Sequence, residues 1–190
     1  IRNNVAVGFQ ALKSNTTGSS NTATGLNSLS NTTTGLYNTA SGAWALYSNV
    51  GGGHNVASGY AAAQFNTTGL YNTSYGYSAL QSVTTSTKNI GIGYTAGDAI
   101  TTGSNNTIIG DLPGTTTLSN TVLIGAGATE RLKVNSTGLY INGTLMSGGG
   151  GASDIDGLTD GHYNATAGSL GLGTGALSSE DVTTFRRNTA

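Results

Sequence analysis

Few residues of this chain belong to the types that catalyse reactions or hold metals. Its 190 residues include eight Asp or Glu, two His and no Cys, which excludes disulfides and thiolate metal sites. His54 and His162 lie far apart in the sequence, and neither has a partner at a regular spacing. The carboxylates are scattered and unpaired, so general acid–base chemistry has no support. We therefore predict no enzyme activity, no catalytic residues, no metal site and no cofactor.

Two short motifs resemble binding sites without meeting their requirements. The segment Asp154–Asp160 is similar to part of a calcium loop, but its Gly157 comes too early for an EF-hand and no Glu closes it. We interpret it as a solvated connector. The segment Gly91–Ala96 matches a GxGxxA dinucleotide pattern, but it lacks the strand-then-helix context that such a site needs.

One column of aromatic residues could bind a surface ligand. At a constant step along the sequence the chain carries Ser20, Tyr37, His54, Tyr71, Lys88 and Asn105, and Trp44 and Tyr47 lie near this column. Aromatic rings offer an apolar face and a polar tip, which suits sugars of a cell surface. The candidate surface-binding residues are Tyr37, Trp44, Tyr47, His54 and Tyr71. Packing between chains of an oligomer is the preferred interpretation of the same residues.

The aromatic column is one part of a 17-residue repeat. The most regular positions are an Asn and, shortly after it, a Gly, each occurring seven times. They are Asn4, Asn21, Asn38, Asn55, Asn72, Asn89 and Asn106, with Gly8, Gly25, Gly42, Gly59, Gly76, Gly93 and Gly110. A second glycine column, beginning at Gly18, closes each unit and usually follows a Thr pair. Such fixed-period self-similarity is typical of solenoids.

The repeat predicts an all-β fold. Short β-prone runs lie between turn residues, and two glycines per unit would allow positive φ at two corners. Units of this kind stack, each strand pairing in parallel with the next, into a parallel β-solenoid or β-roll. Identical Asn residues one turn apart are expected to form an amide-to-amide hydrogen-bond ladder.

The core of each turn should be thin, with one Leu, one or two Ala and one aromatic residue at most. So small a core is marginal by itself, because the apolar area that it buries barely offsets the entropy of ordering the chain. We therefore predict a homotrimer whose three chains share a core.

The composition excludes several partners. Only 8% of residues are charged and the net charge is -1, which gives no electrostatic attraction for nucleic acid or for anionic membranes. No apolar run approaches the roughly 18 residues of a membrane span, so membrane insertion is not expected.

Four segments are expected along the chain. Residues 1–112 form a repeat array of seven turns, and residues 113–147 a closing turn and a β-hairpin built from 131–134 and 139–142. Residues 148–164 form a Gly-rich and acidic connector, and residues 165–190 begin a second, truncated array. Pro113, the only proline, marks the end of the first array.

The repeat resembles two families of fibrous proteins. The unit Asn4–Leu12 is similar to head repeats of trimeric autotransporter adhesins, which form left-handed β-rolls. The longer unit Asn66–Leu80, and the segment Gly127–Gly138, resemble elements of phage tail-fibre proteins. The period is longer than that of the usual adhesin repeat, so the cross-section of the roll could differ.

The resemblance implies an extracellular protein on a virion. It would be a structural segment of a homotrimeric bacteriophage tail fibre that gives rigidity and host-surface attachment. Its partners would be further copies of itself and a host cell-surface glycan or protein. The alternatives are the head of a bacterial trimeric surface adhesin and, ranked lower because the Thr columns are interrupted at Val50–Gly51, an ice-binding β-solenoid.

Overall fold

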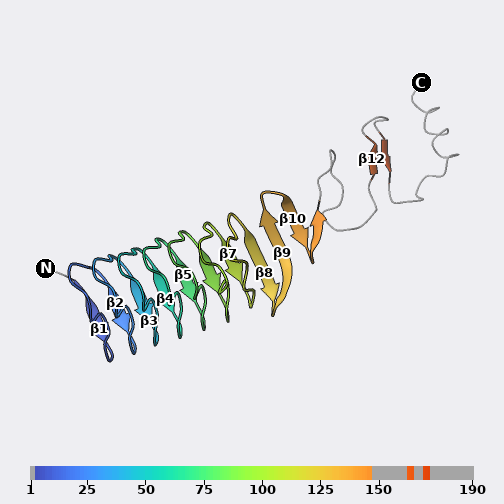
Figure 1. Cartoon of the computed structure of the whole chain (residues 1–190). Coiled ribbons are helices and arrows are strands. Elements are labelled where there is room, and N and C mark those ends of the chain that lie inside the picture. The colour runs from blue at the N-terminus through green and yellow to red at the C-terminus, as the bar shows by residue number, and fades with distance from the viewer. Residues whose placement is uncertain (1–2, 147–161, 165–168, 172–190) are drawn as a thin grey trace, which may run out of the picture. The chain divides into compact units, whose positions relative to one another are not determined.

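The computed structural model describes residues 3–146, 162–164 and 169–171 (Figure 1). All regular structure in these residues is β-strand, and no helix occurs among them. The chain divides into two compact units, Ile1–Thr137 and Gly138–Ala190, which are described separately.

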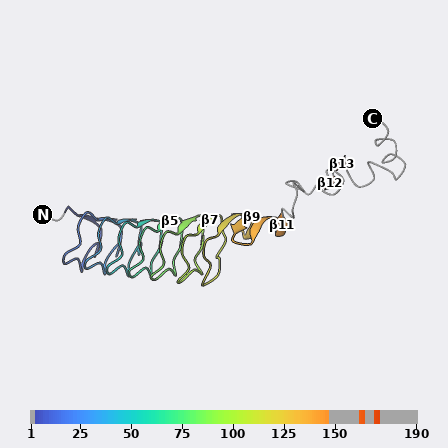
Figure 2. The same cartoon turned by 90° about the horizontal axis from the view of Figure 1, so that it is seen from above.

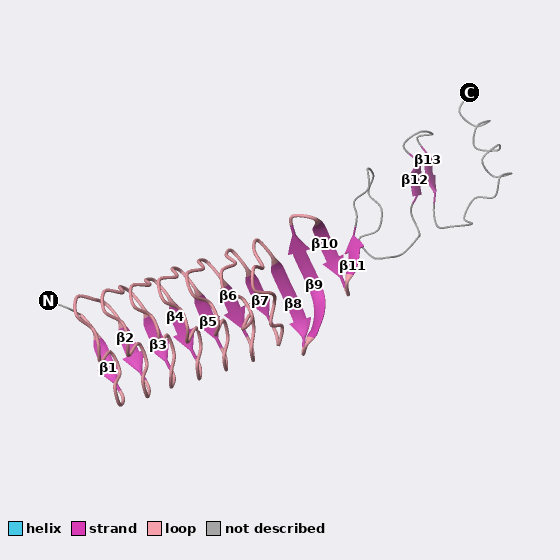
Figure 3. Ribbon diagram, viewed as in Figure 1, coloured by secondary structure: helices cyan, strands magenta, loops and turns pink. Residues whose placement is uncertain are grey.

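The first unit contains one short strand in each repeat. Each strand pairs in parallel with the next, in a register that brings repeat position onto repeat position, so that Ala6 faces Ala23 and Ala23 faces Ala40. Seven such pairings join eight strands (Figure 3), which confirms the predicted all-β parallel β-solenoid. The strands are β1 Val5–Val7, β2 Thr22–Thr24, β3 Thr39–Ser41, β4 Val56–Ser58, β5 Thr73–Tyr75, β6 Ile90–Ile92, β7 Thr107–Ile109 and β8 Val122–Ala126.

The strands form one layer, and the rest of each turn lies on one side of it (Figure 2). Within a strand the middle residue, such as Ala23 or Ala40, is fully buried, and its two neighbours face outward. From the other wall a Leu column meets these alanines, with Leu29, Leu46 and Leu80 fully buried. The core is as thin as expected, but it holds no aromatic residue within the described part of the chain.

The positions of positive φ in each turn differ from the prediction, which placed one at the second glycine column. The first glycine of each repeat has positive φ, for example 130° at Gly25. The second column does not. Left-handed φ instead occurs at three non-glycine positions in a typical turn, such as Asn27, Leu29 and Tyr37, with φ of 57°, 49° and 58°. The prediction of two glycine corners was therefore wrong for the second column.

The second glycines are needed for space. A Cβ placed on Gly35 would lie 2.6 Å from the carbonyl oxygen of Gly52 in the next turn. Real Cβ atoms do not approach backbone oxygens so closely, so even a methyl group would push adjacent turns apart.

The last parallel step is shorter than the others. Thr107 of β7 pairs with Val122 of β8, and Pro113 lies in the shortened loop between these strands. Strand β9, Thr129–Asn135, then pairs antiparallel with β8, with an irregularity at Ile124/Gly125. The parallel stack therefore ends with β8, which lies within residues 113–147, where a closing turn was expected.

The described residues of the second unit form two antiparallel pairs. Strand β10, Gly138–Ile141, forms a hairpin with β11, Thr144–Met146, across a turn at Asn142–Gly143. Both arms of the predicted hairpin are strands, β9 and β10. Strand β11, which pairs with β10 in the second unit, was not predicted.

The second pair joins β12, His162–Asn164, to β13, Ser169–Gly171. Strand β13 lies in the segment 165–190, where a second array was expected, and its only described partner is β12. The remainder of the predicted array, the glycine-rich connector and the Asp154–Asp160 motif lie outside the described residues.

Candidate functional site: ladders and the outer sheet face

The repeated Asn residues form a continuous ladder inside the solenoid. The side-chain oxygen of each accepts the backbone N–H of the equivalent residue one turn later, at 2.9–3.1 Å from Asn4 to Thr121. Each side-chain nitrogen donates to a backbone carbonyl 12 to 14 residues further along, at 2.6–2.9 Å. Direct amide-to-amide bonds occur at three steps, Asn38 to Asn21, Asn55 to Asn38 and Asn106 to Asn89. The main bond of the ladder is therefore from backbone N–H to side-chain oxygen.

A second buried polar column runs parallel to this ladder and was not singled out from the sequence. It contains Asn15, Thr32, Asn49 and Asn66, and then becomes apolar at Val83. Asn66 donates to the side-chain oxygen of Asn49 at 2.9 Å. Thr32 is too short to continue this pattern, and its hydroxyl and the Asn15 oxygen are buried without a hydrogen-bond partner. The Asn of the repeated Asn-Thr-Thr-Gly sequence was the available signal.

The single exception in the second glycine column, Ser86, lies in the turn where the second polar column changes to Val83, although Gly103, which follows Ile100, remains glycine. A Cβ on Gly52 or Gly69 would collide with the side-chain oxygen of Asn49 or Asn66, three residues earlier. In the turn where the column changes to Val83, no such oxygen exists, and the glycine position is occupied by Ser86.

Three of the candidate surface-binding residues lie together. Tyr37, His54 and Tyr71 stack with ring centroids 4.9 and 5.0 Å apart and planes within 17° of parallel. Trp44 and Tyr47 form a separate tilted pair, with centroids 4.7 Å apart. These five residues are therefore in two groups: the three-ring stack precedes the strands in each turn, and Trp44 and Tyr47 follow them.

A second three-ring stack comprises Tyr60, Tyr77 and Tyr94, with centroids 5.2 and 5.3 Å apart. The sequence column was visible, but a surface stack was not predicted. Phe9, earlier in the same column, is 70% exposed. Aromatic residues of this column therefore lie outside the core.

Stacking changes what these rings can bind. Sugars pack against ring faces, but the faces inside each stack are covered by neighbouring rings at about the spacing of adjacent turns. The edges and the polar tips are what the stacks offer to solvent. The structure thus favours a packing role over sugar stacking for Tyr37, His54 and Tyr71.

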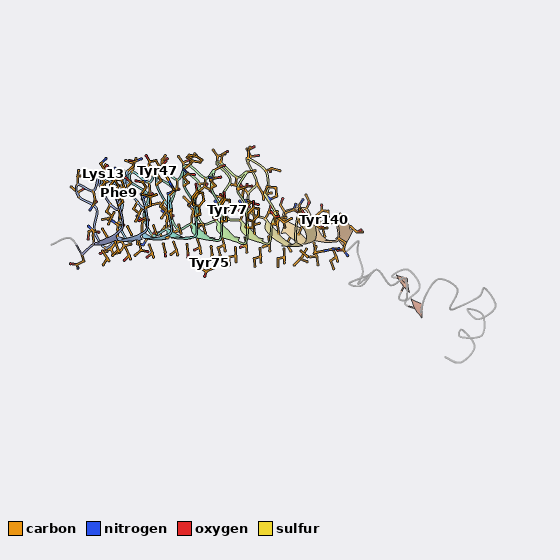
Figure 4. The ribbon with its side chains drawn as sticks, turned by 90° about the horizontal axis from the view of Figure 1, so that it is seen from below. Phe9, Lys13, Tyr47, Tyr75, Tyr77 and Tyr140 are labelled. Atoms are coloured by element: carbon orange, nitrogen blue, oxygen red, sulfur yellow. The ribbon has the colours of Figure 1, made fainter. Side chains whose placement is uncertain are left out.

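The outer sheet face is formed by the outward residues of β1–β8. It carries two columns, and none of its sixteen positions, two on each of eight strands, is charged. Tyr75 points away from the sheet on this side, whereas Lys13 and Tyr47 lie on the opposite side (Figure 4). Tyr75 is 62% exposed, and the exposed apolar residues on this face include Val5, Val7, Val56, Ile90, Ile92 and Ile109.

Charged residues of the coil lie away from the outer sheet face. Asp98 and Asp111 come from successive turns, and burial, followed by the charge of Asp111, raises the pKa of Asp98. The two carboxylates therefore influence each other across successive turns, which their scattered positions in the sequence did not indicate. Thr95 donates to Asp111 at 2.6 Å. In the described part of the chain no three His, Cys, Asp or Glu residues gather where they could hold a metal ion.

Comparison with protein-family models, with curated proteins and with solved structures gives no significant match to this chain. Among the residues that the structure describes, no helix is long and apolar enough to cross a membrane.

Proposed function

We propose that the chain is a structural segment of a homotrimeric fibre of the bacteriophage tail-fibre type, built as a left-handed β-roll. Its role is to give length and rigidity to an extracellular appendage of a virion that attaches to a host surface. The Asn ladder carries this proposal, because side-chain bonds tie each turn to the next in addition to the backbone bonds between strands.

Repeated bonding of this kind suits a rod under mechanical load. The Thr hydroxyls of the column that begins at Thr16 also donate to carbonyls one turn later, at 3.0–3.3 Å. Bending the coil would break several of these parallel bonds at once. These bonds recur from turn to turn, so rigidity is a property that the repeat gives to the whole coil.

The thin core supports the trimer. Each turn buries little more than one Leu and a few Ala, while Val, Ile and Tyr side chains remain exposed on the sheet. Sharing that exposed surface among three chains would add the apolar burial that one coil lacks. The head of a bacterial trimeric adhesin has the same architecture and remains the alternative.

The outer sheet face is too irregular to favour ice binding. An ice-binding face needs regular exposed hydroxyls, but the outer sheet face carries Tyr75, Ile90 and Ile92 beside Thr22 and Thr24. The Thr hydroxyls that bond to the next turn are already engaged with the backbone.

The place where the protein occurs, on virus particles or on cells, tests the proposal and separates it from the adhesin alternative. Antibodies raised against the chain would be applied to cells and to virus particles from the source, and examined by immunogold electron microscopy. Label on filaments that project from virions would support the tail fibre. Label on the cell envelope would favour the adhesin, and label inside cells alone would contradict both.

A further inference from the structure

We infer that the outer sheet face, formed by the outward residues of β1–β8, is where copies of this chain pack against one another. This inference rests on the proposed trimeric fibre and names the surface through which the trimer forms. The occupant is a second and a third copy of the same chain, aligned in parallel.

The distribution of charge is the first argument. Residues 3–126 include four charged side chains, Lys13, Lys88, Asp98 and Asp111, and none lies on the outer sheet face. In a parallel symmetric assembly, equivalent residues meet at the same level, so one charge on the shared face would be brought close to identical charges. A face that packs against the same face of other copies should therefore lack charge, whereas a face exposed only to solvent can carry it.

The apolar side chains on this face are the second argument. Within the stack Val56, Ile90 and Ile92 are 38–42% exposed in the single chain, and Tyr75 is 62% exposed. From β4 to β8 every strand places at least one apolar side chain on this face, whereas β2 and β3 place only Thr and Ser there. An exposed apolar patch of this kind marks an interaction site. Some exposed apolar residues on the loops, such as Leu36 and Phe65, are flanked by Ser or Gly at the equivalent positions of the neighbouring turns. Others, Tyr60, Tyr77 and Tyr94, stack on one another within the chain.

The size of the face is the third argument. Sixteen outward positions approach the roughly 20–30 residues per side of a standard stable interface. The face continues into β9, where Leu132 and Val134 pair with Ile124 and Val122 and share their side of the sheet. Each further turn adds two more positions, so contact area would grow in proportion to the length of the rod.

The shape of the face fits more than one neighbour. Its two columns are two residues apart along each strand, or about 7 Å, and sheets pack face to face at about 10 Å. Three such narrow faces can surround one axis and place six side chains in each layer. One layer would contain Thr73 and Tyr75 from every chain, and the next Ile90 and Ile92.

Single cysteines test the inference cleanly, because the chain has none of its own. Ser41→Cys places a thiol on the outer sheet face, and Lys13→Cys, on the opposite side of the coil, is the matched control. Each full-length variant would be treated with a short bis-maleimide crosslinker and analysed on denaturing gels, and its native mass measured by light scattering.

A trimer in which Ser41→Cys gives covalently linked chains, while Lys13→Cys gives at least ten-fold less, is the expected result. A trimer that crosslinks through Lys13→Cys and not through Ser41→Cys would overturn the inference but leave the trimeric fibre intact. A monomer with neither crosslink would overturn both. Strong labelling of Ser41→Cys by a bulky maleimide within the native trimer would likewise contradict the buried face.

Discussion

Removing one Asn of the ladder should cost much more stability than the loss of an ordinary surface amide. Asn55 is fully buried at the middle of the stack. Its side-chain nitrogen donates to the Gly69 carbonyl at 2.8 Å and to the Asn38 side-chain oxygen at 3.1 Å. Its side-chain oxygen accepts the backbone N–H of Asn72 at 2.9 Å. The variant Asn55→Ala deletes all three bonds.

The expected loss can be worked from these contacts. Three buried hydrogen bonds contribute about 1 kcal/mol each, and the N–H of Asn72 is left buried without a partner, at about 1–3 kcal/mol. The Gly69 carbonyl keeps a second donor, Asn66, at 3.2 Å, so it adds little. We expect Asn55→Ala to lower the free energy of unfolding by about 4–6 kcal/mol.

The assay is urea unfolding followed by circular dichroism, at one fixed protein concentration because assembly makes stability concentration-dependent. The matched control is Asn31→Ala, whose half-buried side chain makes no hydrogen bond within the described residues. The control should change stability by less than about 0.5 kcal/mol. Equal losses for the two variants would refute the ladder as a source of stability.

Three further predictions concern the second polar column and the acidic pair. Thr32→Asn should raise the free energy of unfolding by about 1 kcal/mol, seen as a higher urea midpoint, because an amide at this position gives the unpartnered Asn15 oxygen a donor. Gly69→Ser should destabilise the protein through collision with the Asn66 oxygen, and Asn66→Val in the same chain should recover part of the loss. Asp98→Asn should stabilise the protein at neutral pH and not at pH 3, because a carboxyl whose folded pKa is raised above about 3.8 loses stability as pH rises through that value.

Each of these predictions has its own contrary outcome. A lower midpoint for Thr32→Asn would mean that the column has no room for a second amide in that turn. Additive losses from Gly69→Ser and Asn66→Val would show that the two positions are not coupled. An effect of Asp98→Asn that does not depend on pH would assign it to packing or hydrogen bonding instead of charge.

The fold was predictable because the repeat is exact in two columns. Once Asn21, Asn38 and Asn55 recur at a constant step, parallel stacking in register is the only arrangement that gives each the same surroundings. The ladder followed from the same reasoning, although its main bond goes to the backbone.

The corners could not be predicted, because local preference opposes what the structure does. Leu46 and Trp44 adopt left-handed φ of 49° and 65°, which costs an L-residue roughly 1–2 kcal/mol. Bonds from the adjacent turn hold these residues in place, with Leu46 donating to Ala62 and Trp44 to Leu26. Such strain arises only from stacking, so no reading of one repeat would reveal it.

The aromatic columns illustrate the same limit. The periodic placement of Tyr37, His54 and Tyr71 was evident, and packing between chains was preferred to a sugar-binding surface as its interpretation. The orientation of the rings depends on the left-handed backbone at each of the three residues, with φ of 57–59°. That geometry stacks the rings and covers the faces a sugar would need, which the order of residues alone does not show.

The most direct test of the fibre account is the native mass of the full-length chain in solution. Sedimentation equilibrium at several concentrations would distinguish the monomer mass of 18.9 kDa from a mass three times as large. The account predicts the trimer, stable to dilution, because the outer sheet face should not remain exposed to water. A folded protein that sediments as a monomer at all concentrations would contradict it.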